Sequence, residues 1–231
     1  MNNFQELTDF LDKYNKEYTI HSDCVEVKGD LWLSNNNLAS LPESFGNLQI
    51  GGDFQLFSNN LTSLPESFGN LKIGGDLSLS HNNLASLPES FGNLKICGDL
   101  LLCANKLTSL PESFGNLKIR GDLGLDGNKL TSLPESFGNL KIGGRLYLNG
   151  NKLAYFPDSF FSSGFYTKTS GIKNLDELHS NFLKQEREKI RHKLEAEAEE
   201  KAKREAEEKA KKEAEEHEEM IRFKSQIWVI G

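Results

Sequence analysis

The chain has 231 residues, a formal net charge of −7 and three cysteines. An acidic chain lacks the basic surface that nucleic-acid binding requires, so nucleic acid is excluded as the expected partner. Three cysteines provide no framework of paired disulfides. The N-terminal sequence shows no signal peptide, which would have a basic region followed by an apolar core. No apolar run reaches the roughly 20 residues that a membrane-spanning helix needs. These features predict an intracellular, cytoplasmic protein without a membrane span.

Residues 1–28 precede a long repetitive region and differ from it. Apolar side chains at positions 4, 7, 10, 11 and 14 follow helical spacing, which predicts an amphipathic helix of about three turns. The end of a stacked array exposes apolar surface, so we expect residues 1–28 to form an N-terminal helical cap. Val25 and Val27 then predict a short strand that leads into the first repeat.

Residues 29–164 contain six copies of one phrase, and consecutive copies start 23 residues apart. The clearest copy reads GDLSLSHNNLASLPESFGNLKIC and starts at Gly75. Leucines alternate with polar residues at its beginning, which predicts a short strand whose leucines point inward. The following LPESFGNL predicts a short helical turn that starts at the proline and is ended by the glycine.

An asparagine recurs after every predicted strand, where the chain must turn. A buried turn leaves backbone donors and acceptors without partners, and a carboxamide offers both kinds of group. We therefore expect a structural asparagine ladder that consists of Asn36, Asn59, Asn82, Asn105, Asn128 and Asn151.

An aspartate precedes the strand in the first five copies, at positions 30, 53, 76, 99 and 122. Neighbouring strands lie about 4.8 Å apart, so these carboxylates form a row. Two interpretations stay open: each carboxylate accepts a backbone N–H in the adjacent glycine turn, or Asp53, Asp76 and Asp99 form an acidic stripe for a basic partner. Calcium is a weaker alternative, because one carboxylate per copy supplies too few oxygen ligands.

The outward strand positions differ between copies, whereas the inward positions are nearly identical. Several outward positions hold aromatic or apolar residues, which are typical of protein-binding hot spots. The alternative is that these positions vary without any function, because residues against which nothing packs are free to differ between copies. We predict that a protein partner binds this face through Trp32, Phe57, His81, Leu101 and Tyr147.

The C-terminal quarter is expected to be helical. Residues 165–194 carry a broken apolar stripe and are interpreted as a C-terminal cap and docking helix. Residues 195–231 hold acids placed four residues before bases, the favourable order for helical ion pairs, and an apolar tail. The alanines repeat every four residues without a heptad seam, so a single α-helix is preferred, with a coiled coil and disorder as alternatives. Self-association through residues 195–231 also stays open.

No catalytic or metal-binding arrangement is apparent. The five histidines are scattered, and His21 and Cys24 are the one pair of Cys or His residues that lie three or four positions apart. The glycine pairs recur once in most copies and serve the turns rather than a phosphate loop. We expect no enzymatic activity, no cofactor and no metal.

The 23-residue period with LxLxxNxL, a phenylalanine-centred turn and NL resembles leucine-rich repeats over about residues 29–161. It is similar to the intracellular repeats of Ras-signalling and cell-polarity scaffolds, and to repeat arrays of amoeba-infecting giant viruses and bacteria. The resemblance implies an α/β solenoid, a horseshoe with a concave parallel sheet. The expected fold adds the helical N-terminal cap and the long C-terminal α-helix predicted from the flanking residues. The resemblance also implies a protein-binding adaptor that acts inside a cell. For the viral and bacterial arrays, that cell is a host cell. The alternative is an assembly component that self-associates through its C-terminal helix.

Overall fold

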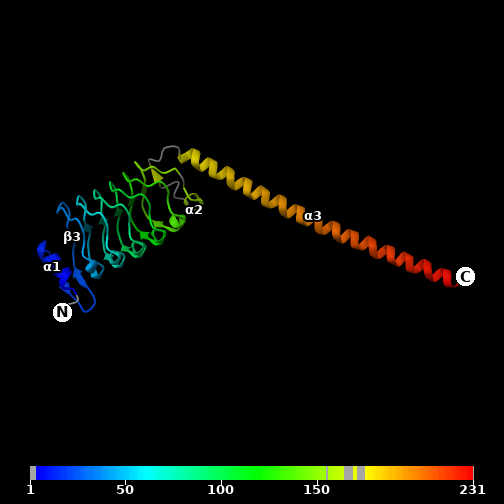
Figure 1. Ribbon diagram of the computed structural model, residues 1–231, viewed down its shortest axis with the longest axis horizontal. Helices are drawn as coiled ribbons and strands as arrows, with labels where there is room; N and C mark the ends of the chain where they lie inside the picture. Colours follow the sequence, from blue (N-terminus) through cyan, green and yellow to red (C-terminus); the bar gives the residue numbers. More distant parts are fainter. Residues whose placement is uncertain (1–3, 155, 164–168, 171–174, 231) are drawn as a thin grey trace. The chain divides into compact units, whose positions relative to one another are not determined.

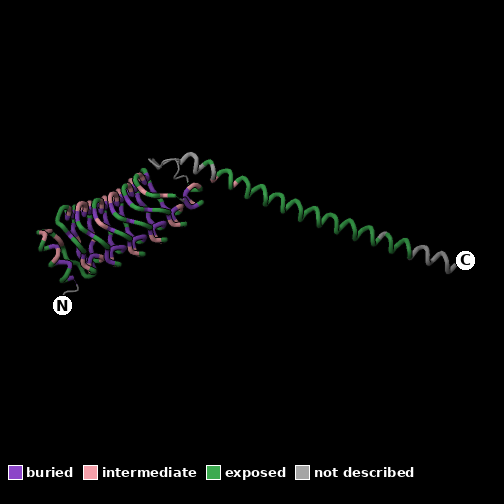
Figure 2. The backbone as a smooth tube through the Cα atoms, turned by 45° about the horizontal axis from the view of Figure 1, so that its top comes forward, coloured by how far each residue is buried: buried purple, intermediate pink, exposed green. Residues whose placement is uncertain are grey.

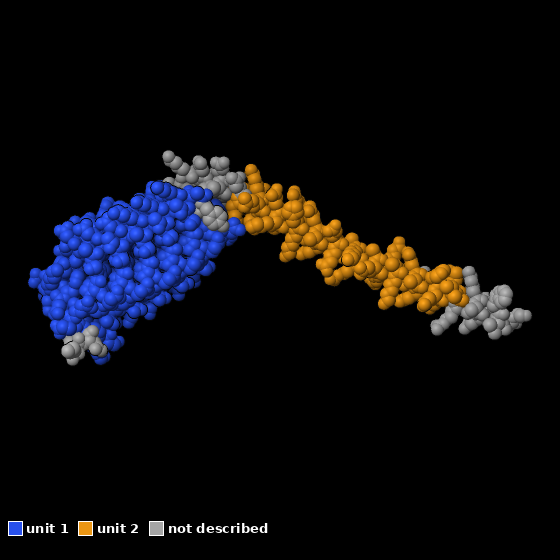
Figure 3. Space-filling view, viewed as in Figure 1, with its two compact units in different colours: residues 1–176 blue, residues 177–231 orange. Residues whose placement is uncertain are grey.

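The computed structural model describes residues 4–154, 156–163, 169–170 and 175–230, without the side chains of residues 169–170, 175–179, 181, 216 and 222–230. The chain forms two compact units, residues 1–176 and residues 177–231 (Figure 3). The first unit is a stack of similar coils; each coil is one turn of the chain formed by one copy of the repeated phrase. The second unit belongs to one long helix (Figure 1).

The N-terminal helix α1 (Gln5–Lys13) forms where the apolar spacing predicts it. Its Leu7 and Leu11 are fully buried, and the ring of Phe10 meets the ring of Phe45 edge-on, with 5.1 Å between centroids. The helix therefore covers apolar surface of the first coil, as the cap prediction requires.

Two short strands follow the helix. β1 (Thr19–Ile20) was not predicted, and it pairs antiparallel with β2 (Val25–Val27). β2 pairs in parallel with the first coil and places Val27 in register with Ile50. β1 is thus the outermost strand of one of the two sheets that run along the stack.

Six coils place one strand each in a parallel sheet of seven strands, the sheet predicted for the concave side. The order is β14-β13-β11-β9-β7-β5-β3, and each pairing joins strands one repeat apart. The strands are β3 (Leu31–Trp32), β5 (Phe54–Gln55), β7 (Leu77–Ser78), β9 (Leu100–Leu101), β11 (Leu123–Gly124), β13 (Leu146–Tyr147) and β14 (Thr169–Ser170).

A second strand in each of the first five coils builds the other sheet, which runs β1-β2-β4-β6-β8, with β10 and β12 pairing separately. These strands are β4 (Leu48–Ile50), β6 (Lys72–Ile73), β8 (Lys95–Ile96), β10 (Lys118–Ile119) and β12 (Lys141–Ile142). The two sheets and the turns between them enclose the core, so buried residues line the inside of the coils in Figure 2.

The predicted helical turns are 3-10 helices, and the sixth coil has the α-helix α2 (Asp158–Ser162) in their place. They are η1 (Glu43–Asn47), η2 (Glu66–Asn70), η3 (Glu89–Asn93), η4 (Glu112–Asn116) and η5 (Glu135–Asn139). The prediction that glycine ends the turn was wrong, because Gly69 lies inside η2, which continues to Asn70. A Cβ added at Gly69 would lie 1.9 Å from the carbonyl oxygen of Ser90 in the next coil. Close approach between coils is therefore what requires glycine here.

Phenylalanines form a continuous buried stack through the coils. The rings of Phe68, Phe91 and Phe114 lie parallel at 6.1 Å between successive centroids and are fully buried. In the second coil Phe54 takes the place of a strand leucine and stacks on the rings of Phe45 and Phe68 at 6.1 and 6.4 Å. Each coil thus completes the apolar core of its neighbours.

Buried asparagines join the coils by hydrogen bonds. The Oδ1 atom of Asn82 accepts the N–H of Leu61 at 3.0 Å, and its Nδ2 donates to the carbonyls of Leu56 and Leu79 at 3.0 Å each. Asn59, Asn105, Asn128 and Asn151 make the same three kinds of bond. Asn36 is exposed, and no coil precedes it among the residues that the structure describes.

The second sheet is interrupted between β8 and β10, where side chains replace glycine. A Cβ added at Gly74 would lie 2.1 Å from the carbonyl oxygen of Gly51, so glycine allows close contact at this position. Cys97 and Arg120 occupy the equivalent positions of the next two coils. The Cys97 N–H reaches the Ile73 carbonyl at 3.2 Å, whereas the Gly74 bond to the coil before it is 2.8 Å long. The interruption in the second sheet thus lies at the coils in which Cys97 and Arg120 stand in place of glycine.

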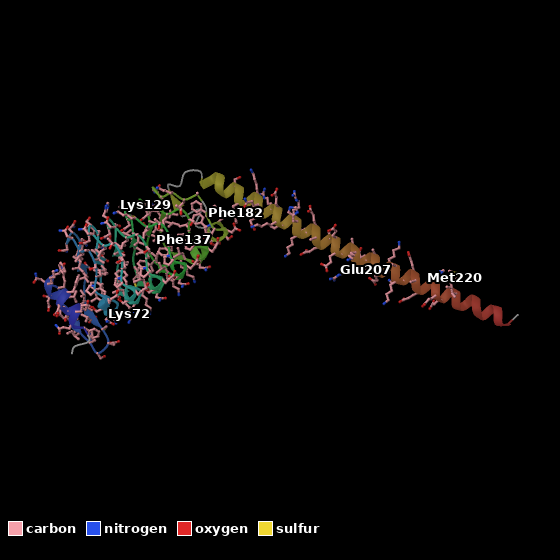
Figure 4. All side chains as sticks on the ribbon, viewed as in Figure 1. Lys72, Lys129, Phe137, Phe182, Glu207 and Met220 are labelled. Carbon is pink, nitrogen blue, oxygen red and sulfur yellow. The ribbon has the colours of Figure 1, made fainter. Side chains whose placement is uncertain are left out.

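The C-terminal helix α3 (Leu175–Ile230) is continuous over 56 residues, across the boundary predicted at residue 195. Every described side chain from residue 191 to residue 221 is exposed, and Figure 4 shows Glu207 and Met220 projecting from the helix. Leu183, Ile190 and Leu194, from the predicted docking stripe, are 42–60% exposed. The rest of the apolar tail, residues 222–230, lies outside the described side chains.

The close approach between coils predicts opposite effects for two glycine-to-alanine substitutions. Gly69→Ala lowers the free energy of unfolding by about 1–3 kcal/mol, because the new methyl group overlaps the next coil. Gly29→Ala meets nothing within 4 Å and leaves the free energy unchanged or up to about 1 kcal/mol higher. Urea denaturation of the two variants measures both values. Equal stability of the two would contradict the packing role of Gly69.

Candidate functional site

The outward side of the seven-stranded sheet presents two rows of side chains that change from coil to coil; we call it the strand face. The register places equivalent residues of consecutive coils side by side. The first row is Trp32, Gln55, Ser78, Leu101, Gly124 and Tyr147, and the second row is Ser34, Phe57, Ser80, Cys103, Asp126 and Asn149.

Four of the five predicted anchors lie on the strand face, but with different exposure. Trp32 is 53% exposed, whereas Phe57, Leu101 and Tyr147 are half-buried. Trp32 stands in register with Gln55, so Phe57 lies diagonally from it, one strand across and two residues along. The two aromatic residues therefore belong to one end of the face without being directly opposed.

Two outward positions are buried by their neighbours. Ser78 is only 4% exposed and stands between Gln55 and Leu101, whose longer side chains flank it. Gly124 is also buried, and a Cβ added there would lie 2.6 Å from Sγ of Cys103 and 3.2 Å from Leu101. Small residues thus sit beneath larger ones, which the alternation of the sequence did not predict.

A compact apolar cluster results at the C-terminal half of the strand face. Leu101 and Cys103 approach Gly124 from one side, and Tyr147 stands in register with Gly124 on the other. The Tyr147 hydroxyl donates to Oδ2 of Asp122 at 3.4 Å. Sequence reasoning missed Cys103 as a member; its outward position two residues after Leu101 was the available signal.

His81 lies on a turn rather than on a strand. It has φ +55° in the left-handed region and is exposed, and Ser58 and Ala104 adopt the same conformation at φ +54° and +53°. The equivalent residues Gly127 and Gly150 adopt it at φ +66° and +67°. His81 is therefore placed at the rim of the strand face, where its ring is accessible.

The aspartate row joins the coils through backbone hydrogen bonds. Oδ1 of Asp53 accepts the N–H of Asp76 at 2.8 Å, and Oδ1 of Asp76 accepts the N–H of Asp99 at 2.7 Å. Asp99 and Asp122 continue the row, which ends on the N–H of Arg145. These bonds agree with the first of the two interpretations, and the acidic stripe stays a prediction.

Asp126 repeats this arrangement in the second row of the strand face. Its Oδ1 accepts the N–H of Asn149 at 2.6 Å. Sequence reasoning did not identify this residue, although it is the one carboxylate in that row. It adds a negative charge beside the cluster of Leu101, Cys103 and Tyr147.

The described residues contain no group of three or more His, Cys, Asp or Glu side chains that could hold a metal ion. Burial raises the pKa of the Cys103 thiol, so it stays protonated at neutral pH and is a poor nucleophile. Among the helices within the described ranges, none is long and apolar enough to cross a membrane.

The aspartate row predicts that the stability of the fold depends on the acceptor atom of each side chain more than on its charge. Asp76→Ala leaves the Asp99 N–H without its acceptor and lowers the free energy of unfolding by about 1–3 kcal/mol. Asp76→Asn keeps an Oδ1 acceptor and changes the free energy of unfolding by about 0.5 kcal/mol or less. Chemical denaturation at neutral pH compares the two variants. If asparagine were as damaging as alanine, the backbone bond would not be the stabilising interaction.

Known leucine-rich repeat proteins are similar to parts of this chain. A family model described as Leucine Rich Repeat matches residues 30–48 and 76–94. A solved leucine-rich repeat protein of Leptospira interrogans shares 32% sequence identity, with a TM-score of 0.44. The match covers 61% of this chain and 42% of the Leptospira chain, so the chain corresponds to less than half of that protein. No match was found among curated proteins. The family match at two copies and the repeated strand–turn coils show that the chain contains leucine-rich repeats.

Proposed function

We propose that the chain is a non-enzymatic adaptor whose strand face binds a protein partner. Leucine-rich repeat domains generally mediate protein–protein interaction. The observation that carries the proposal is Trp32, a large aromatic side chain left 53% exposed on a sheet whose inward leucines are fully buried. Such residues are typical of binding hot spots.

The strand face offers two apolar regions for a partner. One consists of Trp32 and Phe57, and the other is the cluster of Leu101, Cys103 and Tyr147. Ser80 and the rim residue His81 lie between them and supply polar groups. An apolar pair of anchors with polar surroundings is the usual arrangement of a protein interface.

The sheet beneath the strand face favours binding because it is already ordered. Backbone bonds such as Leu33 N–H to the Gln55 carbonyl and Leu56 N–H to the Ser78 carbonyl are 2.8 Å long. The aspartate row adds a second line of bonds between the coils. A partner therefore loses little free energy in ordering this surface.

The charged part of α3 is consistent with an adaptor that carries a single-helix arm in addition to its repeats. Within residues 195–219 it carries ion pairs four residues apart, including Glu200 to Arg204 at 2.6 Å and Lys201 to Glu205 at 3.8 Å. Exposed charges on all sides suit a single helix in water better than a coiled coil with an apolar seam. The free thiols of all three cysteines agree with a reducing, intracellular location as part of the proposal.

The strand-face proposal predicts loss of partner capture after four substitutions. The variant Trp32→Ser, Phe57→Ser, Leu101→Ser and Tyr147→Ser loses capture of a partner from host-cell extract, since each hot-spot truncation costs about 2 kcal/mol or more of binding. The single variant Trp32→Ser weakens capture at least about tenfold and keeps the melting temperature within a few degrees, because its side chain is half exposed.

A matched control uses four exposed lysines of the second sheet, Lys72, Lys95, Lys118 and Lys141, each changed to Ser. Capture by this control variant equals that of the unchanged chain. Unaltered capture by the strand-face variants would contradict the proposal. Sedimentation at micromolar concentration tests the alternative of self-association through α3, which requires a dimer or larger species.

A further inference from the structure

The first strand of the seven-stranded sheet has an unpaired outer side. At the other end of this sheet β13 is followed by β14, and the second sheet begins with the antiparallel strand β1. Within the part of the chain that the structure describes, β3 pairs with β5 alone. Figure 1 shows β3 at the N-terminal end of the stack.

The bonds between later coils show which backbone groups of β3 face outward. Leu31 N–H donates to the carbonyl of Asp53, and Leu33 N–H donates to the carbonyl of Gln55, both at 2.8 Å. Gln55 thus directs its carbonyl at the preceding coil. Trp32 is the equivalent residue of the first coil, so its carbonyl faces the side on which the described residues place no coil.

The same comparison applies to the residues on both sides of Trp32. The carbonyls of Asp53 and Phe57 accept N–H groups of the preceding coil, the latter from Asn35 at 3.2 Å. The carbonyls of Asp30 and Ser34 are their equivalents in the first coil. Three acceptors at alternate positions therefore line the outer side of β3.

Side chains at both ends of β3 extend this pattern. The N–H of Asp53 donates to a carboxylate of the preceding coil, Asp30, at 2.8 Å, so the N–H of Asp30 faces the position of a missing carboxylate. Asn59 bonds to Leu33 and Leu38 of the preceding coil, whereas Asn36 is exposed and bonds to the nearby Ser34 carbonyl. Donors and acceptors for one further strand are thus in place.

Open space is present at each end of this edge. A hollow of about 410 Å³ is lined by Tyr18, Thr19 and the turn from Lys28 to Asp30. A second hollow of about 590 Å³ lies between α1 and residues 36–43, with Phe10 and Tyr14 among its lining. The exposed Trp32 lies between the two ends.

We propose that β3 binds an extended peptide segment of a partner protein as an additional parallel strand. An exposed strand edge is a template for such pairing, and backbone bonds supply much of the affinity. The segment would carry Asp or Asn in register with Asp30 and an aromatic residue in register with Trp32, since cross-strand aromatic pairs stabilise sheets. Its inward positions would be small, because Leu31 is already fully buried. This site uses backbone groups and is distinct from the strand face, although Trp32 borders both.

The probe is a fluorescein-labelled peptide, Gly-Asp-Ala-Tyr-Ala-Ser-Asn-Asn, with blocked ends, and the full chain is titrated into it. Fluorescence anisotropy rises and saturates. In the proposed register the N–H groups of the two alanines donate to the carbonyls of Asp30 and Trp32. N-methylation of both alanines weakens binding by about tenfold or more, because two hydrogen bonds are lost.

N-methylation of the tyrosine is the matched control, since its N–H faces away from β3, and it changes the dissociation constant less than about threefold. Equal losses from the two modifications, or no saturation at millimolar protein, would overturn the proposal. The Trp32→Ser chain binds more weakly but keeps the difference between the two modified peptides. Failure of the strand-face proposal therefore leaves this result unchanged.

Discussion

The buried carboxamide after the strands β5, β7, β9 and β11 is the interaction on which the array depends. Asn82 receives an N–H from Leu61 and donates to Leu56 in the preceding coil, while it also donates to Leu79 in its own coil. One side chain thus pairs three buried backbone groups that water cannot reach. A coil without a neighbour leaves these groups unpaired, so the stability of the array resides between coils rather than within them.

This dependence on neighbours explains which positions are free to vary. The inward leucines, the stacked phenylalanines and the glycines of the 3-10 turns contact the next coil and are nearly the same in every copy. On the strand face, the Trp32 side chain is half exposed and is not part of this packing between coils. Such residues are free to vary and can bind a partner. The first coil differs for the same reason, because one side of β3 and the carboxamide of Asn36 have no coil to join among the described residues.

The sequence period predicted the solenoid and its parallel strands, because these follow from spacing within one copy. Helical spacing in residues 1–28 predicted the N-terminal helix. The period did not predict features that depend on the distance between copies. The need for glycine at Gly69 and the burial of Ser78 each arise where a residue meets the adjacent coil. Of the candidate site, the sequence identified the large residues, but not the packing of Cys103 over Gly124.

The unfolding free energies of Asn82→Ala and Asn36→Ala test the central claim most directly. Asn82→Ala removes the partner of three backbone groups, so it lowers the free energy of unfolding by about 2 kcal/mol or more. Asn36→Ala changes an exposed residue with no coil before it, and its effect stays within about 0.5 kcal/mol. Urea denaturation of both variants gives the comparison. Equal effects of the two substitutions would contradict the claim that bonds between coils hold the array together.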